Sequence, residues 1–226
     1  AIARAFAVVR DAWKLRDPVQ QVAGSLYPGA ALGAVLAGDL VTLFVCWELA
    51  AVSSVFLIWA QRTERAYRAG LRYLVIQVGS GVLLLAGSIV HIRATGSTAF
   101  DHLGPDSPGA TLMLVAFGVK AAFPLLHNWL QDAYPEATAT GAVVLSAFTT
   151  KMAIYALVRG FAGTEILIAI GAVMAVFPIF FAAIESDLRR VLAYSMNAQL
   201  GFMVVGIGIG TPLALDGVVA HAVADI

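Results

Sequence analysis

Three ionisable side chains lie deep inside apolar stretches of this chain. Glu48 lies in LFVCWELAAVSS, Lys120 in FGVKAAFP and Lys151 in FTTKMAIYALVR. A charge near the middle of a lipid bilayer costs about 2.5 to 3.5 kcal/mol on insertion scales, so such a residue normally faces the protein interior and has a partner or water. Because ionisable residues at membrane depth are usually functional, we predict that these three side chains bind protons and pass them on.

Glu48 and Lys120 would form a switch if their ion pair can be made and broken. Burial disfavours the charged form of either side chain, and an opposite charge nearby favours it. At about 4 Å and an effective dielectric constant of about 20, their attraction is roughly 4 kcal/mol. Separating the pair would therefore let the lysine release its proton. The alternative is a permanent ion pair that fixes the helix register, with Lys151 extending to a lipid head group.

Pro124 follows Lys120 by four residues and has no amide proton to donate, so it predicts a kink or break in the helix. Broken helices near the middle of a membrane commonly surround ion sites, because freed backbone groups must be satisfied by protein or water. His127 lies three residues further on and titrates near neutral pH. It could relay protons between Lys120 and the cytoplasmic side, or it could be a structural hydrogen-bonding residue.

The composition predicts a polytopic membrane protein of the all-α class. Of the 226 residues, 60% are hydrophobic and 12% charged, and the mean hydropathy is +0.86. Apolar runs of about 20 residues are long enough to cross a bilayer as helices. The candidate spans are residues 19–38, 40–60, 73–92, 109–131, 139–159, 163–184 and 191–210, and an eighth begins near Leu213. We therefore expect a transmembrane domain over residues 19–226, preceded by an amphipathic segment at residues 1–18.

The distribution of basic residues predicts the orientation of these spans. Threading them alternately leaves only Arg93 and Arg159 of the 14 Lys and Arg residues on one side of the membrane. Lys120 and Lys151 lie at membrane depth, and the remaining basic residues lie on the other side. The positive-inside rule assigns that basic side to the cytoplasm. We expect an integral protein of the bacterial inner membrane, with its basic loops in the cytoplasm.

Several other classes of function find no support in the sequence. The net charge is zero and there is no clustered basic surface, which argues against nucleic acid as a partner. Cys46 is the single cysteine, and His91, His102 and His221 have no metal-ligand spacing, so neither a disulfide framework nor a metal site is predicted. The stretches GSGVLLLAG and GIGIG are typical of close helix packing. No cofactor site for NAD, flavin or an iron–sulfur cluster is visible.

Four motifs give the chain a family resemblance. GDLVTLFVCWELAAVSS, FGVKAAFPLLHNWLQDAYPEA, LSAFTTKMAIYALVR and DLRRVLAYSMNAQLGFMVVGIG resemble, in order and spacing, the antiporter-like subunits shared by Mrp cation/proton antiporters and respiratory complex I, with the D-type subunit of the Mrp antiporters the nearest match. The resemblance implies an inverted-repeat fold that contains a broken helix. The spans resemble the family's fourth to tenth helices and the start of the eleventh, so we expect this chain to be a fragment.

The resemblance also assigns roles to individual residues. It implies that Glu48 and Lys120 are the glutamate and lysine partners, that Lys151 is the lysine of the following helix, and that His127 is the histidine beyond the break. Near the end of the chain, His221 matches the first histidine of a family motif, whereas Asp225 stands at the second. Both are candidates for the proton path. The stretch YSMNAQ also departs from the more usual YSSISQ or YSSISH.

The leading hypothesis is proton translocation by one component of a multisubunit Mrp-type cation/proton antiporter. One alternative is the proton-pumping membrane subunit of a complex I-like NADH or ferredoxin dehydrogenase or of a membrane hydrogenase, in which other subunits carry the redox sites. A second alternative is a non-transporting structural paralogue. The expected partners are other membrane subunits, protons, lipid and, in the antiporter, Na⁺.

Overall fold

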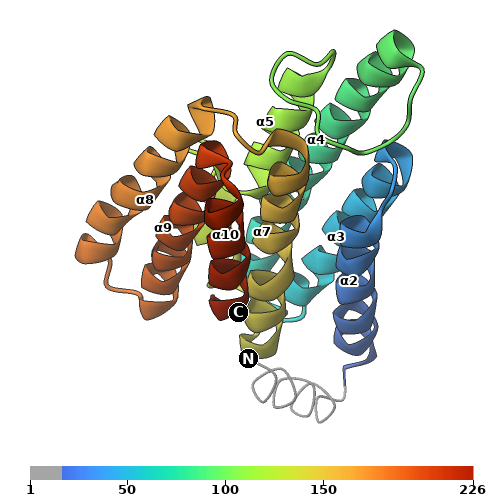
Figure 1. The fold of residues 1–226 in the computed structure, drawn as a ribbon. Helices are drawn as coiled ribbons and strands as arrows, with labels where there is room; N and C mark the ends of the chain where they lie inside the picture. Colours follow the sequence, from blue (N-terminus) through green and yellow to red (C-terminus); the bar gives the residue numbers. More distant parts are fainter. Residues whose placement is uncertain (1–16, 226) are drawn as a thin grey trace.

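The computed structural model describes residues 17–225 as a bundle of helices (Figure 1). Within this range there is no β-strand, only an isolated bridge between Asp39 and Ala99. The all-α prediction is therefore confirmed. The helices are α2 (Pro18–Leu36), α3 (Leu40–Trp59), α4 (Glu64–Thr95), α5 (Ala110–Lys120), α6 (Asn128–Ala133), α7 (Ala139–Phe161), α8 (Ile166–Ile184), α9 (Leu188–Ile209) and α10 (Pro212–Ala224). The predicted amphipathic segment lies almost wholly outside the described residues.

Five of these helices, α3, α4, α7, α8 and α9, are long and apolar enough to cross a membrane. Helix α2, which matches the least apolar predicted span, does not reach that hydropathy, and α5 and α10 are shorter. The polytopic membrane class is confirmed, whereas the count of seven spans stays a prediction. Helix α7 contacts α2, α3, α5 and α9 and so occupies the centre of the bundle (Figure 1).

Side-chain caps fix where several helices begin. Asp39 caps α3 by accepting hydrogen bonds from the amides of Val41 and Thr42 and from the Thr42 hydroxyl. These hydrogen bonds lower the pKa of Asp39. Thr138 caps α7 through the amide of Gly141. Such caps satisfy amides that have no partner within the first helical turn.

The long loop between α4 and α5 folds back onto the tight joint between α2 and α3. The amide of Leu40 donates to the Thr98 carbonyl at 2.8 Å, and the amide of Phe100 donates to the Gly38 carbonyl at 3.0 Å. The Phe100 ring is fully buried, and the Arg159 guanidinium lies over it at 4.8 Å from the ring centroid. The loop thereby ties α2, α3 and α7 together at one end of the bundle.

The predicted span over residues 109–131 is interrupted. Helix α5 ends at Lys120, four residues before Pro124, and α6 begins at Asn128. Within the irregular segment, Ala122 and Leu125 have positive φ angles of 60° and 69°, a conformation that side chains disfavour. The indole nitrogen of Trp129 donates to the Val119 carbonyl at 2.9 Å and so satisfies one group that the break frees.

Helices α8 and α9 pack closely along their lengths through small residues. A Cβ atom added at Gly171 would lie 2.6 Å from the Val205 amide nitrogen and 2.7 Å from the Gly201 carbonyl oxygen. A Cβ atom at Gly201 would collide with the backbone of Ala175. The two backbones can approach this closely only because neither position has a side chain.

We expect Gly201→Ala to destabilise the protein by about 1 to 3 kcal/mol, because the added methyl group overpacks the contact between α8 and α9. Thermal unfolding in detergent would measure the change. Gly79→Ala is the matched control, since Gly79 is also within a helix and a Cβ atom there meets no atom within 4 Å. Equal unfolding temperatures for the two variants would contradict the close-packing argument.

Candidate functional site

Lys120 is the last residue of α5 and is almost completely buried, with 1% of its surface exposed. Its ammonium nitrogen Nζ donates to the Trp47 carbonyl at 3.3 Å and lies 4.4 Å from the centroid of the Trp47 ring. The carboxyl end of a helix carries partial negative charge, and an aromatic face attracts a cation. The described residues thus surround this buried lysine with partial negative charges and give it no formal counter-charge in direct contact.

Glu48 follows Trp47 on α3 and points toward α4. A Cβ atom at Gly81 would coincide with the Glu48 carboxylate, so the carboxylate occupies the space that this glycine leaves free. Its oxygen Oε1 is buried and has no hydrogen-bond partner within residues 17–225. Glu48 and Lys120 are close enough to interact electrostatically, but these two described residues form no direct ion pair. The structure therefore brings the predicted partners together in a separated arrangement.

Lys151 lies on α7 and forms an ion pair with Asp225, the residue that follows α10. The Lys151 Nζ and the Asp225 Oδ2 are 2.6 Å apart, and their side chains are only 9% and 19% exposed. One turn earlier on α10, the His221 Nε2 lies 2.8 Å from the Gln199 Oε1. A largely apolar cavity of about 420 Å³ between α2, α7 and α10 is also lined by Lys151.

His127 stands at the N-terminal end of α6, at the far end of the break. Its ring lies edge-on to Phe177 with the centroids 6.0 Å apart, and its Nδ1 is buried with no partner among the described residues. Neither a hydrogen bond nor a ring contact joins the described side chains of His127 and Lys120. The two predicted residues therefore lie at opposite ends of the same irregular segment, which contains Pro124.

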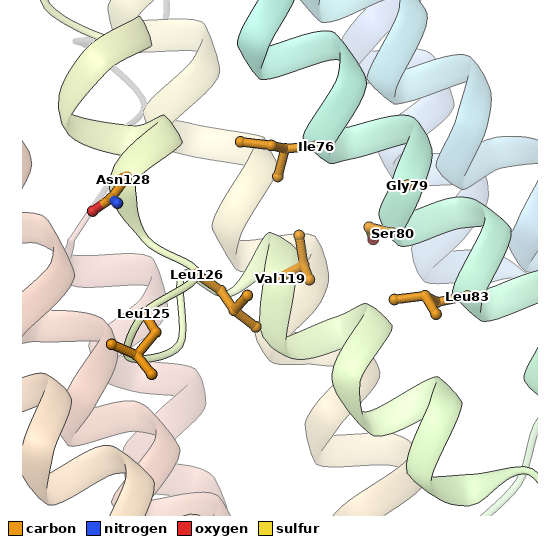
Figure 2. A pocket seen from close by; sticks show the side chains of 8 residues that line it. All are labelled: Ile76, Gly79, Ser80, Leu83, Val119, Leu125, Leu126 and Asn128. Carbon is orange, nitrogen blue, oxygen red and sulfur yellow. The ribbon is translucent and has the colours of Figure 1, made fainter.

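A cavity of about 330 Å³ lies beside this break. Figure 2 shows Leu125, Leu126 and Asn128 on one side of it and the α4 residues Ser80 and Leu83 on the other. Val119, the residue before Lys120, also lines it, as do Ile76 and Gly79 of α4. Ser80 accepts a hydrogen bond from the indole of Trp47, whose carbonyl accepts one from Lys120. The wall of this cavity is thus connected to Lys120 through Trp47.

The sequence predictions missed a group of buried hydroxyls near the centre of the bundle. Its members come from α2, α3, α4, the segment after α6, and α7: Tyr27, Ser54, Tyr73, Tyr134 and Thr149. A signal was present, because Tyr73, Gln77 and Ser80 recur at helical spacing inside an apolar stretch and are all buried. Among the described residues, no group of three or more His, Cys, Asp or Glu side chains could hold a metal ion.

We expect Lys120→Met to raise the stability of the protein, because an apolar side chain replaces a buried charge that has no direct counter-ion among the described residues. A methionine fills nearly the same volume without a charge. Lys120→Ala is the control, because it removes the charge but leaves a cavity and should be less stable than the methionine variant. If thermal unfolding in detergent showed both variants below the wild type, the lysine would contribute net stability.

Comparison with known proteins relates these features to a family. The chain is 32% identical over 209 residues to the D-type subunit of the Na(+)/H(+) antiporter of Alkalihalophilus pseudofirmus, covering 84% of this chain and 42% of that protein. It is 30% identical over 226 residues to NADH-quinone oxidoreductase subunit M of Pseudomonas aeruginosa, covering 87% and 44%. The chain therefore spans less than half the length of these relatives.

Solved structures agree with the sequence comparisons. A chain of the Mrp complex from Dietzia sp. DQ12-45-1b superposes with a TM-score of 0.81 at 25% identity, covering 87% of this chain and 40% of that one. A chain of the membrane-bound sulfane sulfur reductase, an archaeal respiratory membrane complex, gives a TM-score of 0.79 at 28% identity and covers 87% and 44%. The family model described as NADH:quinone oxidoreductase/Mrp antiporter, TM, matches residues 37–225. The chain belongs to this family.

Proposed function

We propose that this chain is the proton-translocating part of one component in a multisubunit Mrp-type cation/proton antiporter. The observation that carries the proposal is the fully buried Lys120 at the end of an interrupted helix, beside but not paired with Glu48. A buried lysine without a direct counter-ion gives up its proton more easily than a paired one. Movement of the Glu48 carboxylate toward or away from Lys120 therefore changes the proton affinity of the site.

The proton path continues to the second lysine. In the proposed cycle, Lys120 receives a proton while Glu48 is close and releases it toward Lys151 when Glu48 withdraws. Asp225 is the counter-ion of Lys151, which passes its own proton toward His221, one turn away on α10, before it accepts the proton from Lys120. His127 and Pro124 lie in the break, which is the segment able to move with least disturbance of regular helix.

Transport of this kind needs a second source of free energy. Each elementary charge moved against the membrane potential requires about 2.3 kcal/mol per 100 mV. In an antiporter, a cation such as Na⁺ moving the other way supplies or takes up this energy. We place the protein in the bacterial inner membrane with the connection between α3 and α4 in the cytoplasm, because that connection is followed by Arg65, Arg68 and Arg72.

A complex I-like pump is the second candidate function. The similarity to a quinone oxidoreductase subunit and to the sulfane sulfur reductase complex is nearly as strong as the similarity to the antiporters. In such a complex, redox reactions in other subunits would drive the same proton-carrying residues. Copurification of redox subunits with the full-length protein would favour this candidate, and flux that requires Na⁺ without a redox substrate would favour the antiporter.

We expect Lys120→Ala and Glu48→Ala each to lower proton flux by at least about tenfold, a loss of roughly 1.4 kcal/mol of transition-state stabilisation. The full complex in inverted membrane vesicles would be assayed by quenching of a pH-sensitive dye on addition of Na⁺. Arg68→Ala is the control, because Arg68 is exposed and its ion pair is with Glu64 on the same helix. Undiminished flux in both site variants at matched expression would show that the buried charges are structural.

We also expect Asp225→Asn to lower flux, because it removes the counter-charge of a largely buried lysine, whereas Asp225→Glu should retain most of it. The same vesicle assay measures both variants. Wild-type flux in Asp225→Asn would remove this ion pair from the proposed path.

A further inference from the structure

We infer that the buried hydroxyls of Tyr27, Ser54, Tyr73 and Thr149 form a proton access route to Glu48 from the end of the bundle that bears the α3–α4 connection. This inference rests on the proposed function and names residues that function does not otherwise use. Within this hydroxyl cluster, the Tyr27 hydroxyl lies 2.5 Å from the Thr149 Oγ1, and the Ser54 Oγ lies 2.8 Å from the Tyr73 hydroxyl. All four side chains are at most 1% exposed.

The hydrogen bonds in this cluster can reverse direction. In both pairs either oxygen can be the donor, because each hydroxyl has one proton and two lone pairs. Tyr73 also interacts with the Thr149 side chain, which joins the two pairs into one cluster. When one hydroxyl oxygen accepts a proton, it donates its own proton to the next oxygen. The relay therefore moves charge, and every hydroxyl ends in its neutral form.

The outer end of the cluster lies beside exposed charges. Arg72 precedes Tyr73 on α4 and pairs with Asp132 at 3.2 Å, with side chains 64% and 38% exposed. Tyr134 lies two residues after Asp132, is buried, and interacts with Thr149. The cluster therefore begins within one or two residues of a surface ion pair and continues into the fully buried interior.

The inner end of the cluster points along α4 toward Glu48. Tyr73, Gln77 and Gly81 are spaced four residues apart and share one helix face, and Gly81 adjoins the Glu48 carboxylate. The distance from Tyr73 to Gly81 along the axis is about 12 Å at the helical rise of 1.5 Å per residue. Gln77 lies midway and is fully buried, yet neither its amide oxygen nor its amide nitrogen has a partner among residues 17–225.

An unpartnered buried amide of this kind is costly unless water satisfies it. Gln77 can donate to one neighbour and accept from another, so water molecules on either side of it would complete a chain from Tyr73 to Glu48. The unpartnered Oε1 of Glu48 is then the receiving atom. The cluster, Gln77 and Glu48 form one polar line through an otherwise apolar interior.

The test compares single hydroxyl deletions in the full complex, assayed for Na⁺-dependent proton flux in inverted vesicles. We expect Tyr73→Phe and Thr149→Val each to lower flux per assembled complex by at least about tenfold, and Thr149→Ser to restore it. Thr150→Val is the matched control, because the neighbouring Thr150 is equally buried but its hydroxyl has no partner among the described residues. Its flux should stay within about twofold of the wild type.

The outcomes separate this inference from the proposed function. If Lys120→Ala abolishes flux while Tyr73→Phe and Thr149→Val leave it unchanged, the access route is wrong and the proposed function stands. If Lys120→Ala leaves flux unchanged, the proposed function is wrong, and the access route that rests on it is wrong as well. Equal losses in Thr149→Val and Thr150→Val would also overturn the route, because they would reflect disturbed packing. Should Thr149→Val fail to assemble, Tyr73→Phe and Thr149→Ser decide the question.

Discussion

The candidate site is organised around one buried ammonium group. Lys120 is almost completely enclosed by protein and has no carboxylate of the described residues in direct contact, and a charge in such surroundings is stable only where many weaker interactions converge on it. The carbonyl and ring of Trp47 provide two of them, and the carboxyl end of α5 provides a third. Lys120 is also the last residue of α5, so the break and the lysine belong to one arrangement.

The rest of the bundle holds this arrangement in place. Trp129 closes the break by donating to the Val119 carbonyl, and Ser80 fixes the Trp47 indole while donating in turn to the Ala116 carbonyl of α5. Gly81 leaves the space in which the Glu48 carboxylate lies. Helices α3, α4 and α5 are thus joined around Lys120, and the segment between Lys120 and Asn128 holds two residues in a disfavoured backbone conformation.

The sequence was sufficient to predict the helical class and the helix break, because charges in apolar runs and a proline inside a span are local signals, whereas the partnership of Glu48 with Lys120 was implied by the family resemblance. The end of α5 at Lys120 fits the predicted effect of Pro124, because a proline cannot donate to the carbonyl four residues earlier, and Trp129 satisfies the neighbouring Val119 carbonyl. The pairing of Lys151 with Asp225 joins residues 74 positions apart and could not be derived from spacing. The hydroxyl cluster was missed for the same reason, because its members come from separate segments of the chain.

The two lysines illustrate two ways of burying a positive charge. Lys151 has a carboxylate at 2.6 Å, whereas Lys120 has only dipoles and an aromatic face in direct contact. In the proposed cycle, an approach of Glu48 would give Lys120 the kind of counter-charge that Lys151 already has in Asp225, and so would raise the affinity of Lys120 for a proton. In the cycle that we propose, the separation of Glu48 from Lys120 is for this reason the variable on which the direction of transfer depends. A chain with both lysines in permanent ion pairs would lack this variable and could not use it to drive protons from one site to the other.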